Sequence, residues 1–245
     1  MNEASPAPQL SIGKLILIPS VITLGITILR LVGELQQGPS LLFNRDAGGG
    51  AALIGISWLP LILGPYFAVK LKNAGLIPTG CDKVIAFASR TLGRSLAGIT
   101  WLPPLVTIWI AVVGLVLFFV ASFVAFAPKT SPGKFAAGGV IMLVAAVVTW
   151  VGWPALGKTL VAYGYAARIP VVIVMYFAIQ GNWGTHYDGL PPNYTGPTDA
   201  LGKFFFIGFL PQLIFWIVYT LVVGALIGTI AAAIVQRKRA LPPKA

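Results

Sequence analysis

Five polar side chains in and just after an apolar stretch at residues 12–33 could do chemistry together. They recur at spacings of three and four residues, which places them on one face of a helix. Because polar groups that face lipid are costly, we expect this face to line the protein interior or a wet cavity. The pattern therefore predicts one wall of a permeation or binding path. Its members are Ser20, Thr23, Thr27, Arg30 and Glu34.

Two features of this face leave an alternative open. Arg30 and Glu34 are four residues apart and can pair, although arginine before glutamate is the weaker order. The alternative is that the serine and threonine hydroxyls bond their own backbone. Arg30 would then extend to the outer headgroups of the bilayer.

A second group of chemically active side chains lies in a polar loop at residues 181–202, which is rich in glycine and proline. Its candidates are Trp183, His186, Tyr187 and Asp188. An aromatic-rich loop can cap a cavity or contact a partner, because loops carry function disproportionately. His186 and Asp188 could form a proton site. The alternative is an ordered lid whose aromatic rings lie at the headgroup level.

Metal, cofactor and enzyme signatures are missing. One cysteine, one histidine and six acidic residues are too few for a cysteine-built or multi-histidine site. The patterns Gly-x-Ser-x-Gly and His-Glu-x-x-His do not occur. Residues 152–159 match the spacing of a phosphate-binding loop, but no strand precedes them and Pro154 would obstruct the cradle. We therefore expect no cofactor and no enzyme; a lipid-modifying enzyme would need catalytic groups from the outer loop.

Small residues form two further helical faces, which predict helix packing rather than chemistry. One face contains Thr107 and Gly114, and the other is the Gly-x-x-x-Gly pair of Gly224 and Gly228. Such faces let helices approach closely, within one bundle or between protomers. Packing within the chain is the preferred interpretation.

The composition excludes a soluble protein. Hydrophobic residues make up 57% of the 245 residues, charged residues only 9%, and the mean hydropathy is +0.88. A soluble domain carries about 25% charged residues. The net charge of +11 does not indicate nucleic-acid binding, because most basic residues lie in short loops between apolar stretches. The chain is therefore expected to be an all-α membrane protein.

Six apolar stretches approach the length of about 20 residues that a helix needs to cross a bilayer. The first lacks a small-x-small cleavage site and is expected to be a retained span rather than a signal peptide. Together they predict a single polytopic membrane domain of residues 1–245. The expected spans are residues 12–33, 51–69, 98–127, 135–157, 160–180 and 204–235.

The basic residues predict the orientation of these spans. With the N-terminus inside, twelve lysines and arginines fall on the inner side, four fall on the outer side, and Arg30 lies in the first span. By the positive-inside rule, both termini are cytoplasmic. The Ala- and Gly-rich composition suggests a bacterial inner membrane. The inner set is Lys14, Lys70, Lys72, Lys83, Arg90, Arg94, Lys158, Arg168, Arg237, Lys238, Arg239 and Lys244; the outer set is Arg45, Lys129, Lys134 and Lys203.

A cytoplasmic segment at residues 70–97 is predicted to form an amphipathic helix between the second and third spans. Val84, Ile85, Ala88, Leu92 and Leu96 fall on one helical face, whereas the other side is basic. Such a helix lies in the interface, with its cations near anionic lipid. The alternative is a docking helix for a cytoplasmic partner. The basic residues are Lys83, Arg90 and Arg94.

Two functions remain for this layout. The preferred one is a small channel or permease, alone or as a homo-oligomer, whose path is lined by the polar face of the first span. The alternative is a non-catalytic membrane subunit of a larger complex. The layout resembles that of ABC-2 type exporter permeases in topology only, so no functional position is carried over. An anchoring subunit of a respiratory or photosynthetic assembly fits as well.

Overall fold

The computed structural model of the chain describes residues 10–47, 52–93, 95–96, 99, 102–126, 131–192 and 194–240. Within these residues the chain is helical and contains no strand. Two short π-helical segments, η2 and η3, lead into the last helix. The elements are α1 (Ile12–Leu35), α2 (Leu59–Asn73), α3 (Gly80–Thr91), α4 (Leu102–Phe126), α5 (Pro132–Gly152), α6 (Pro154–Gly181), α7 (Ala200–Lys203), η2 (Phe204–Phe209), η3 (Pro211–Phe215) and α8 (Trp216–Ala240).

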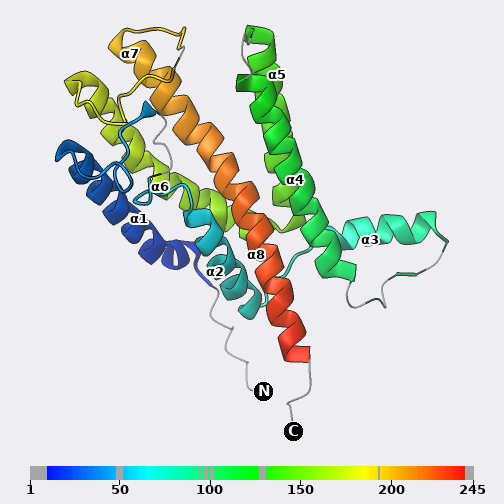
Figure 1. The fold of residues 1–245 in the computed structure, drawn as a ribbon. Helices are drawn as coiled ribbons and strands as arrows, with labels where there is room; N and C mark the ends of the chain where they lie inside the picture. Colours follow the sequence, from blue (N-terminus) through cyan, green and yellow to red (C-terminus); the bar gives the residue numbers. More distant parts are fainter. Residues whose placement is uncertain are drawn as a thin grey trace, which may run out of the picture.

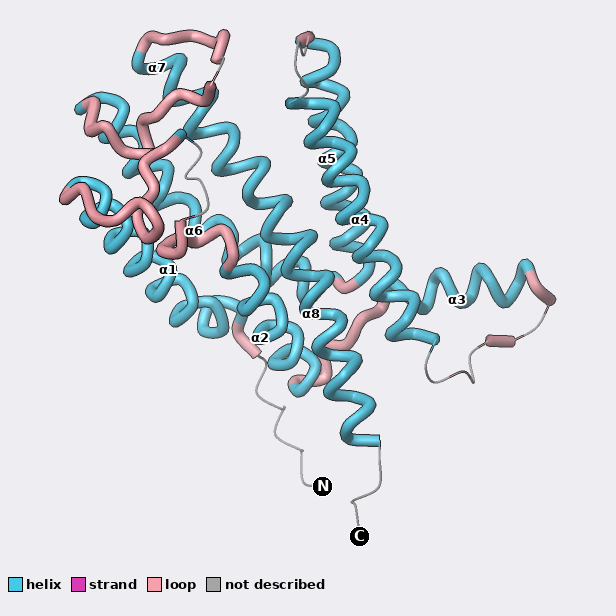
Figure 2. The backbone as a smooth tube through the Cα atoms, viewed as in Figure 1, coloured by secondary structure: helices cyan, strands magenta, loops and turns pink. Residues whose placement is uncertain are grey.

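The helices form an up-and-down bundle. Helices α4 and α5 make an antiparallel hairpin on one side, α1, α2 and α6 lie on the other, and α8 runs between them (Figure 1). The start of α1 and the end of α8 lie at the same end of the bundle (Figure 2). We call this the termini end, and the opposite end, which carries the loops at 36–58 and 182–199, the loop end.

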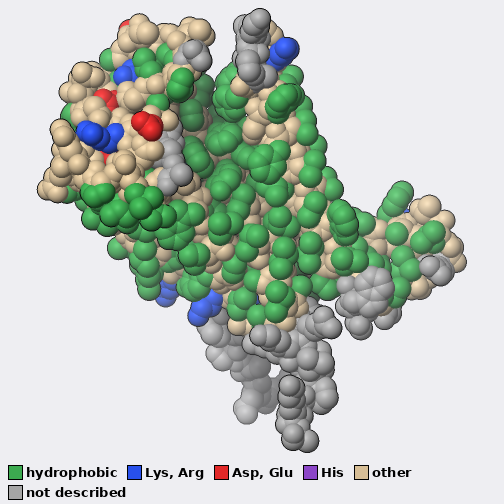
Figure 3. Space-filling model, viewed as in Figure 1, with side chains coloured by type: hydrophobic (Ala, Val, Ile, Leu, Met, Phe, Trp, Pro, Cys, Tyr) green, Lys and Arg blue, Asp and Glu red, His purple; other side chains and the backbone are tan. Residues whose placement is uncertain are grey.

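The core lies where α2, α6 and α8 meet. Its large side chains, Phe67, Leu71, Leu156, Leu160 and Leu221, are each 2% exposed or less. Elsewhere large apolar side chains point outward, as in Ile18, Phe123 and Leu143 on α1, α4 and α5, and Figure 3 shows hydrophobic side chains covering the middle of the bundle. An apolar surface of this extent is not stable in water.

Five helical segments are long and apolar enough to cross a bilayer: α1, α4, residues 133–152 of α5, α6 and the continuous segment Ala200–Val235. Together with the apolar surface, they indicate an integral, multi-pass membrane protein. Helix α2 is not among them.

The predicted second span, residues 51–69, differs most from the structure. Residues 52–58 form turns, and the helix begins only at Leu59. Pro60 fixes this start, because proline lacks the backbone N–H and favours the first turn of a helix. The 15 residues of α2 rise about 22 Å, less than the roughly 30 Å of a hydrocarbon core. The described chain therefore returns from the loop end partly as irregular backbone, at residues 52–58, and partly as α2.

The boundary between the predicted spans 135–157 and 160–180 is also displaced. The helices are interrupted at Trp153, whose backbone is extended (φ −145°, ψ 87°), and not near Lys158. Pro154 explains this break, because a residue before proline is pushed out of the helical region. Trp153 is buried, and its indole nitrogen donates to the carbonyl of Leu76 (2.9 Å).

Helix α3 projects sideways from the bundle, next to the start of α4 (Figure 1). Its first turn packs on the end of α5, where a side chain at Gly80 would overlap the backbone of Val151. Ile85 of the predicted apolar face is buried, whereas Lys83 and Arg90 are exposed. Arg94 lies outside the described residues.

Candidate functional site

The polar face of α1 points into the bundle. Thr23, Thr27, Arg30 and Glu34 are each 8% exposed or less. Ser20 is half-buried, and its hydroxyl has no hydrogen-bond partner within the described part of the chain. This face lies against α6, away from lipid.

Both threonines bond the backbone of their own helix, as the alternative interpretation expected. Thr23 donates to the carbonyl of Pro19 (2.8 Å), and Thr27 donates to the carbonyl of Thr23 (2.9 Å). The Thr23 hydroxyl also lies 2.8 Å from the Tyr163 hydroxyl of α6. The Thr23 hydroxyl therefore bonds the backbone of α1 and also contacts α6.

Arg30 and Glu34 form a buried ion pair at the loop end of α1. Arg30 Nε donates to Glu34 Oε1 over 2.7 Å, and the two side chains are 9% and 0% exposed. Arg30 Nη2 also donates to the carbonyl of Asn44 (3.0 Å). The expectation that Arg30 extends to the headgroups is therefore wrong. Its charge has a partner one helical turn away, and the loop at 36–58 covers both.

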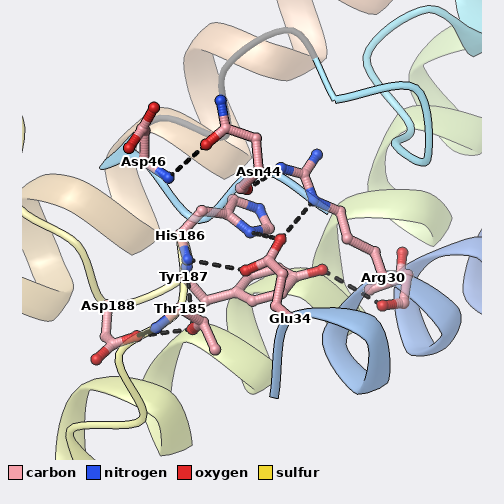
Figure 4. A network of polar contacts seen from close by, with 9 residues as sticks. Arg30, Glu34, Asn44, Asp46, Thr185, His186, Tyr187 and Asp188 are labelled. Atoms are coloured by element: carbon pink, nitrogen blue, oxygen red, sulfur yellow. Dashed lines mark hydrogen bonds and ion pairs between the residues drawn. The ribbon is translucent and has the colours of Figure 1, made fainter. Parts of the chain in front are cut away.

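His186 joins this pair from the second loop (Figure 4). Its backbone N–H donates to Glu34 Oε2 over 2.9 Å. Its Nδ1 lies 2.5 Å from Glu34 Oε1, although not in the orientation of a hydrogen bond. Glu34 thus holds a span and a loop together through both carboxylate oxygens. We call Arg30, Glu34 and His186 the loop clamp.

Tyr187 and Asp188 support the clamp in different ways. Tyr187 is buried, and its hydroxyl donates to the carbonyl of Thr27 (3.3 Å). Asp188 turns back into its own loop and accepts from the N–H groups of Gly184 (2.9 Å) and Thr185 (2.7 Å). Asp188 therefore shapes the turn that presents His186, and among the described contacts no hydrogen bond joins the two side chains. Trp183 is 39% exposed.

Burial dominates the titration of the two loop residues. It lowers the pKa of His186 below its ordinary value of 6.5, despite the opposing effect of the Glu34 carboxylate. His186 is therefore neutral at pH 7. Burial also raises the pKa of the Tyr187 phenol well above its usual range, against the effect of Arg30. The net charge of the loop clamp at neutral pH is close to zero.

The described residues of the loop between α1 and α2, 36–47 and 52–58, close the clamp from the other side, a contact that no periodic pattern in the sequence indicates. A side chain at Gly55 would touch Arg30 Nη1, and one at Gly189 would contact Ala47 of this loop at 3.3–3.4 Å. The two loops therefore pack directly on each other. An open hollow of about 640 Å³ on this surface is lined by residues of both loops, including Asn44, Asp46 and Gly184.

Comparison of the chain with protein-family models, with curated proteins and with solved structures finds no match.

A second buried cation lies deeper in the bundle. Arg168 stands halfway along α6 and is 5% exposed. Its Nη1 donates to Gln212 Oε1 of η3 over 2.9 Å, and its guanidinium lies 4.4 Å from the centre of a Trp216 ring. Arg168 therefore lies inside a spanning helix, and the prediction that places it among the inner basic residues is wrong. One feature of the sequence indicates this burial: Arg168 lies in the middle of an apolar stretch of 21 residues, 160–180.

The small-residue faces are used between helices of this chain. A side chain at Gly64 of α2 would overlap the backbone of Gly224, and one at Gly228 would crowd Gly64. On the other face, a side chain at Gly114 would overlap the hydroxyl of Thr149 on α5. Thr107 is buried and lines a hollow of about 300 Å³ at the termini end.

No cluster of three histidine, cysteine or carboxylate side chains suitable for a metal ion occurs in the described ranges. The groups that the structure does bring together at the site are buried charges, hydroxyls and aromatic rings.

Proposed function

We propose that this protein is a transporter of small solutes, and that the loop clamp closes its path at the loop end. The path follows the polar face of α1 and the facing side of α6, from the Thr23–Tyr163 contact to Tyr187 and the clamp. The proposal places both termini on the cytoplasmic side of a bacterial inner membrane, as the remaining basic residues favour.

The clamp is the observation that carries the proposal. Burying an ion pair is expensive, and well-packed apolar residues in its place are often equally stable or more so. Ionisable groups inside membrane proteins accordingly tend to mark substrate pathways. Here the buried pair joins a span to two loops, which suits a gate that must open and close.

In this structure the path is closed. Thr23 is 0% exposed and Thr27 is 2% exposed, and Tyr163 and Tyr187 contact them from α6 and the outer loop. A solute passes the loop end only if the two loops separate and the clamp breaks. The arrangement therefore supports a gated permease rather than an open channel.

The proposal is tested by locking the loops. Cβ atoms at Ala47 and Gly189 would lie 3.4 Å apart, close to the 3.5–4.5 Å of a disulfide. Ala47→Cys and Gly189→Cys are combined in a Cys81→Ser background and reconstituted into liposomes. Swelling is then measured in iso-osmotic glycerol, sorbitol, sodium acetate and sodium octanoate.

We expect at least one solute to enter faster than in protein-free liposomes. Oxidation of the double variant should abolish this flux, and a reducing agent should restore it. The two single-cysteine variants serve as controls and should be insensitive to both treatments. Flux that persists in the oxidised variant, or no flux for any solute, would contradict the proposal.

The second candidate is a non-catalytic membrane subunit, and α3 is the observation that favours it. Phe87 is 72% exposed on a helix that stands away from the bundle, next to the exposed Lys83 and Arg90. Lys83→Glu with Arg90→Glu should then release a stoichiometric partner that co-purifies with the wild-type chain in mild detergent. If the charge reversal weakens only membrane association, α3 is an interfacial helix.

A further inference from the structure

We propose that Arg168 binds the carboxylate of an amphipathic, fatty-acid-like anion that reaches it from the bilayer. The inference rests on the proposed transport function, because it names the substrate class. It depends on the surroundings of one buried charge, which lies apart from the loop clamp.

Arg168 has no acidic partner among the described residues. Glu34 pairs with Arg30, Asp188 bonds its own loop, and Asp199 accepts from the Gly202 N–H at the start of α7. No described carboxylate lies within 4.0 Å of the guanidinium. A buried cation without a countercharge is strongly unfavourable, so its retention at mid-depth in a membrane protein points to an anion supplied from outside.

The groups around Arg168 orient it without neutralising it. Gln212 accepts from Nη1 through its Oε1, while its Nε2 lies 3.6 Å from Met175 Sδ. Trp216 covers one face of the guanidinium. The other guanidinium nitrogens make no hydrogen bond in the described part of the chain. Because a guanidinium presents its donors in a planar fork, this free edge suits the two oxygens of a carboxylate.

The orienting groups come from an irregular part of the last helix. Segments η2 and η3 are π-helical, and Pro211 at the start of η3 has no N–H to donate to the helical ladder. π-Helical turns are rare and occur frequently at functional sites. This irregular segment places Gln212 over α6, and Trp216 begins the regular helix that follows.

Aromatic rings lead from the lipid-facing surface to Arg168. Phe215 lies 5.1 Å from Phe118 and 5.7 Å from Phe126, both on α4, and 5.4 Å from Trp216. Phe215, Trp216 and Tyr219 are only partly buried. Figure 3 shows a furrow with hydrophobic walls between the α4–α5 hairpin and the rest of the bundle. These rings offer an apolar chain a surface that ends at a cation.

The size and charge of the site select the anion. Arg168 is a single positive charge, so a singly charged group neutralises it. Because Arg168 is only 5% exposed, only a small anionic group can reach its guanidinium. A carboxylate is small enough, whereas a phospholipid headgroup is too large. The geometry therefore points to a carboxylate on an apolar chain.

The test measures equilibrium binding, which requires no transport. The protein in nanodiscs is titrated with a fluorescent C18 polyene carboxylate, and the bound probe is competed with oleate, methyl oleate and dioleoylphosphatidylglycerol. We expect oleate to displace the probe and the other two to do so at least tenfold more weakly. Equal competition by methyl oleate or by the phospholipid would overturn the inference.

Two variants separate a binding role of Arg168 from a structural one. Arg168→Gln should weaken probe binding at least tenfold without lowering the thermal unfolding temperature, because it removes an uncompensated charge. Gln212→Glu supplies an internal carboxylate, and it should raise the unfolding temperature while blocking binding. Lys158→Gln, at an exposed position of the same helix, is the matched control and should change neither.

Wild-type affinity in Arg168→Gln or in Gln212→Glu would overturn the inference. So would a lowered unfolding temperature in both variants, because Arg168 would then serve the fold. The result is independent of the flux experiment: carboxylate binding without flux contradicts transport, and flux without carboxylate binding contradicts only the substrate class.

Discussion

At the scale of single residues, Glu34 is the member of the loop clamp on which the others depend. Its carboxylate accepts from Arg30 and from the backbone of His186, so Glu34→Gln leaves Arg30 buried without its countercharge. Breaking a buried pair in this way costs about 3 kcal/mol. We expect a clearly lower thermal unfolding temperature in detergent, whereas Arg45→Gln, at an exposed loop position, should leave it unchanged. Equal effects of the two variants would show that the clamp contributes nothing.

The titration of His186 predicts a pH dependence of stability. Because burial places its folded pKa below the unfolded value of 6.5, the unfolded chain binds more protons between the two values, and stability falls as the pH falls through this window. Glu34, Arg30 and Asp188 act electrostatically on the imidazole. We expect the unfolding temperature to fall from pH 7.5 to pH 5.5, and to fall less in His186→Gln. An identical pH profile for the two proteins would refute this assignment.

The site was only partly predictable from the sequence at this scale. A three-and-four spacing is local, so it places Thr23, Thr27, Arg30 and Glu34 on one face. It does not specify which segment 152 residues away supplies the backbone N–H to Glu34. Arg168 was misassigned because charge counting sorts every basic residue to one side of the membrane. In the structure, Gln212 and Trp216 accommodate it inside the bundle.

At the scale of elements, the contact between α2 and α8 depends on two facing glycines. A methyl group at Gly64 would overlap the backbone of Gly224, and overpacking of this kind typically costs 1–3 kcal/mol. We expect Gly64→Ala to be destabilised by about 2 kcal/mol, as measured by thermal unfolding in detergent. The matched control is Gly25→Ala on α1, where the added methyl meets nothing within 4 Å. It should be neutral or slightly stabilised by the higher helix propensity of alanine.

A loss of stability in Gly25→Ala as large as that in Gly64→Ala would contradict this reasoning, because the effect would then come from glycine itself and not from the contact. Retained stability in Gly64→Ala would indicate that α2 can move away from α8.

Helix boundaries were predictable to the extent that hydropathy determines them. The apolar stretches locate α1 and α4 closely, because a lipid-facing helix needs a continuous apolar surface. Hydropathy does not indicate where a proline ends a helix within an apolar stretch. Pro60 and Pro154 therefore displace the start of α2 and the break before α6 from their predicted places, although both prolines are visible in the sequence.

At the scale of the whole molecule, the all-helical class and the membrane environment follow from composition. The packing of the loops at 36–58 and 182–199 over the clamp does not. Loop structure depends on contacts such as that between Gly189 and Ala47, which join segments far apart in the chain and leave no periodic pattern. The furrow beside α8 could not be predicted from the sequence either, because it depends on the orientation of the α4–α5 hairpin relative to the rest of the bundle.

The path of the chain through the membrane gives the last prediction. Because α1 rises from the termini end and α2 returns to it, the loop at 36–58 and helix α3 should lie on opposite sides of the bilayer, even though α2 is short for a span. In a Cys81→Ser background, a membrane-impermeant maleimide should label Ser40→Cys in intact spheroplasts. It should label Lys83→Cys only after permeabilisation; both positions are exposed. Labelling of both from one side would mean that residues 52–73 do not cross, and that the chain has five spans with its termini on opposite sides.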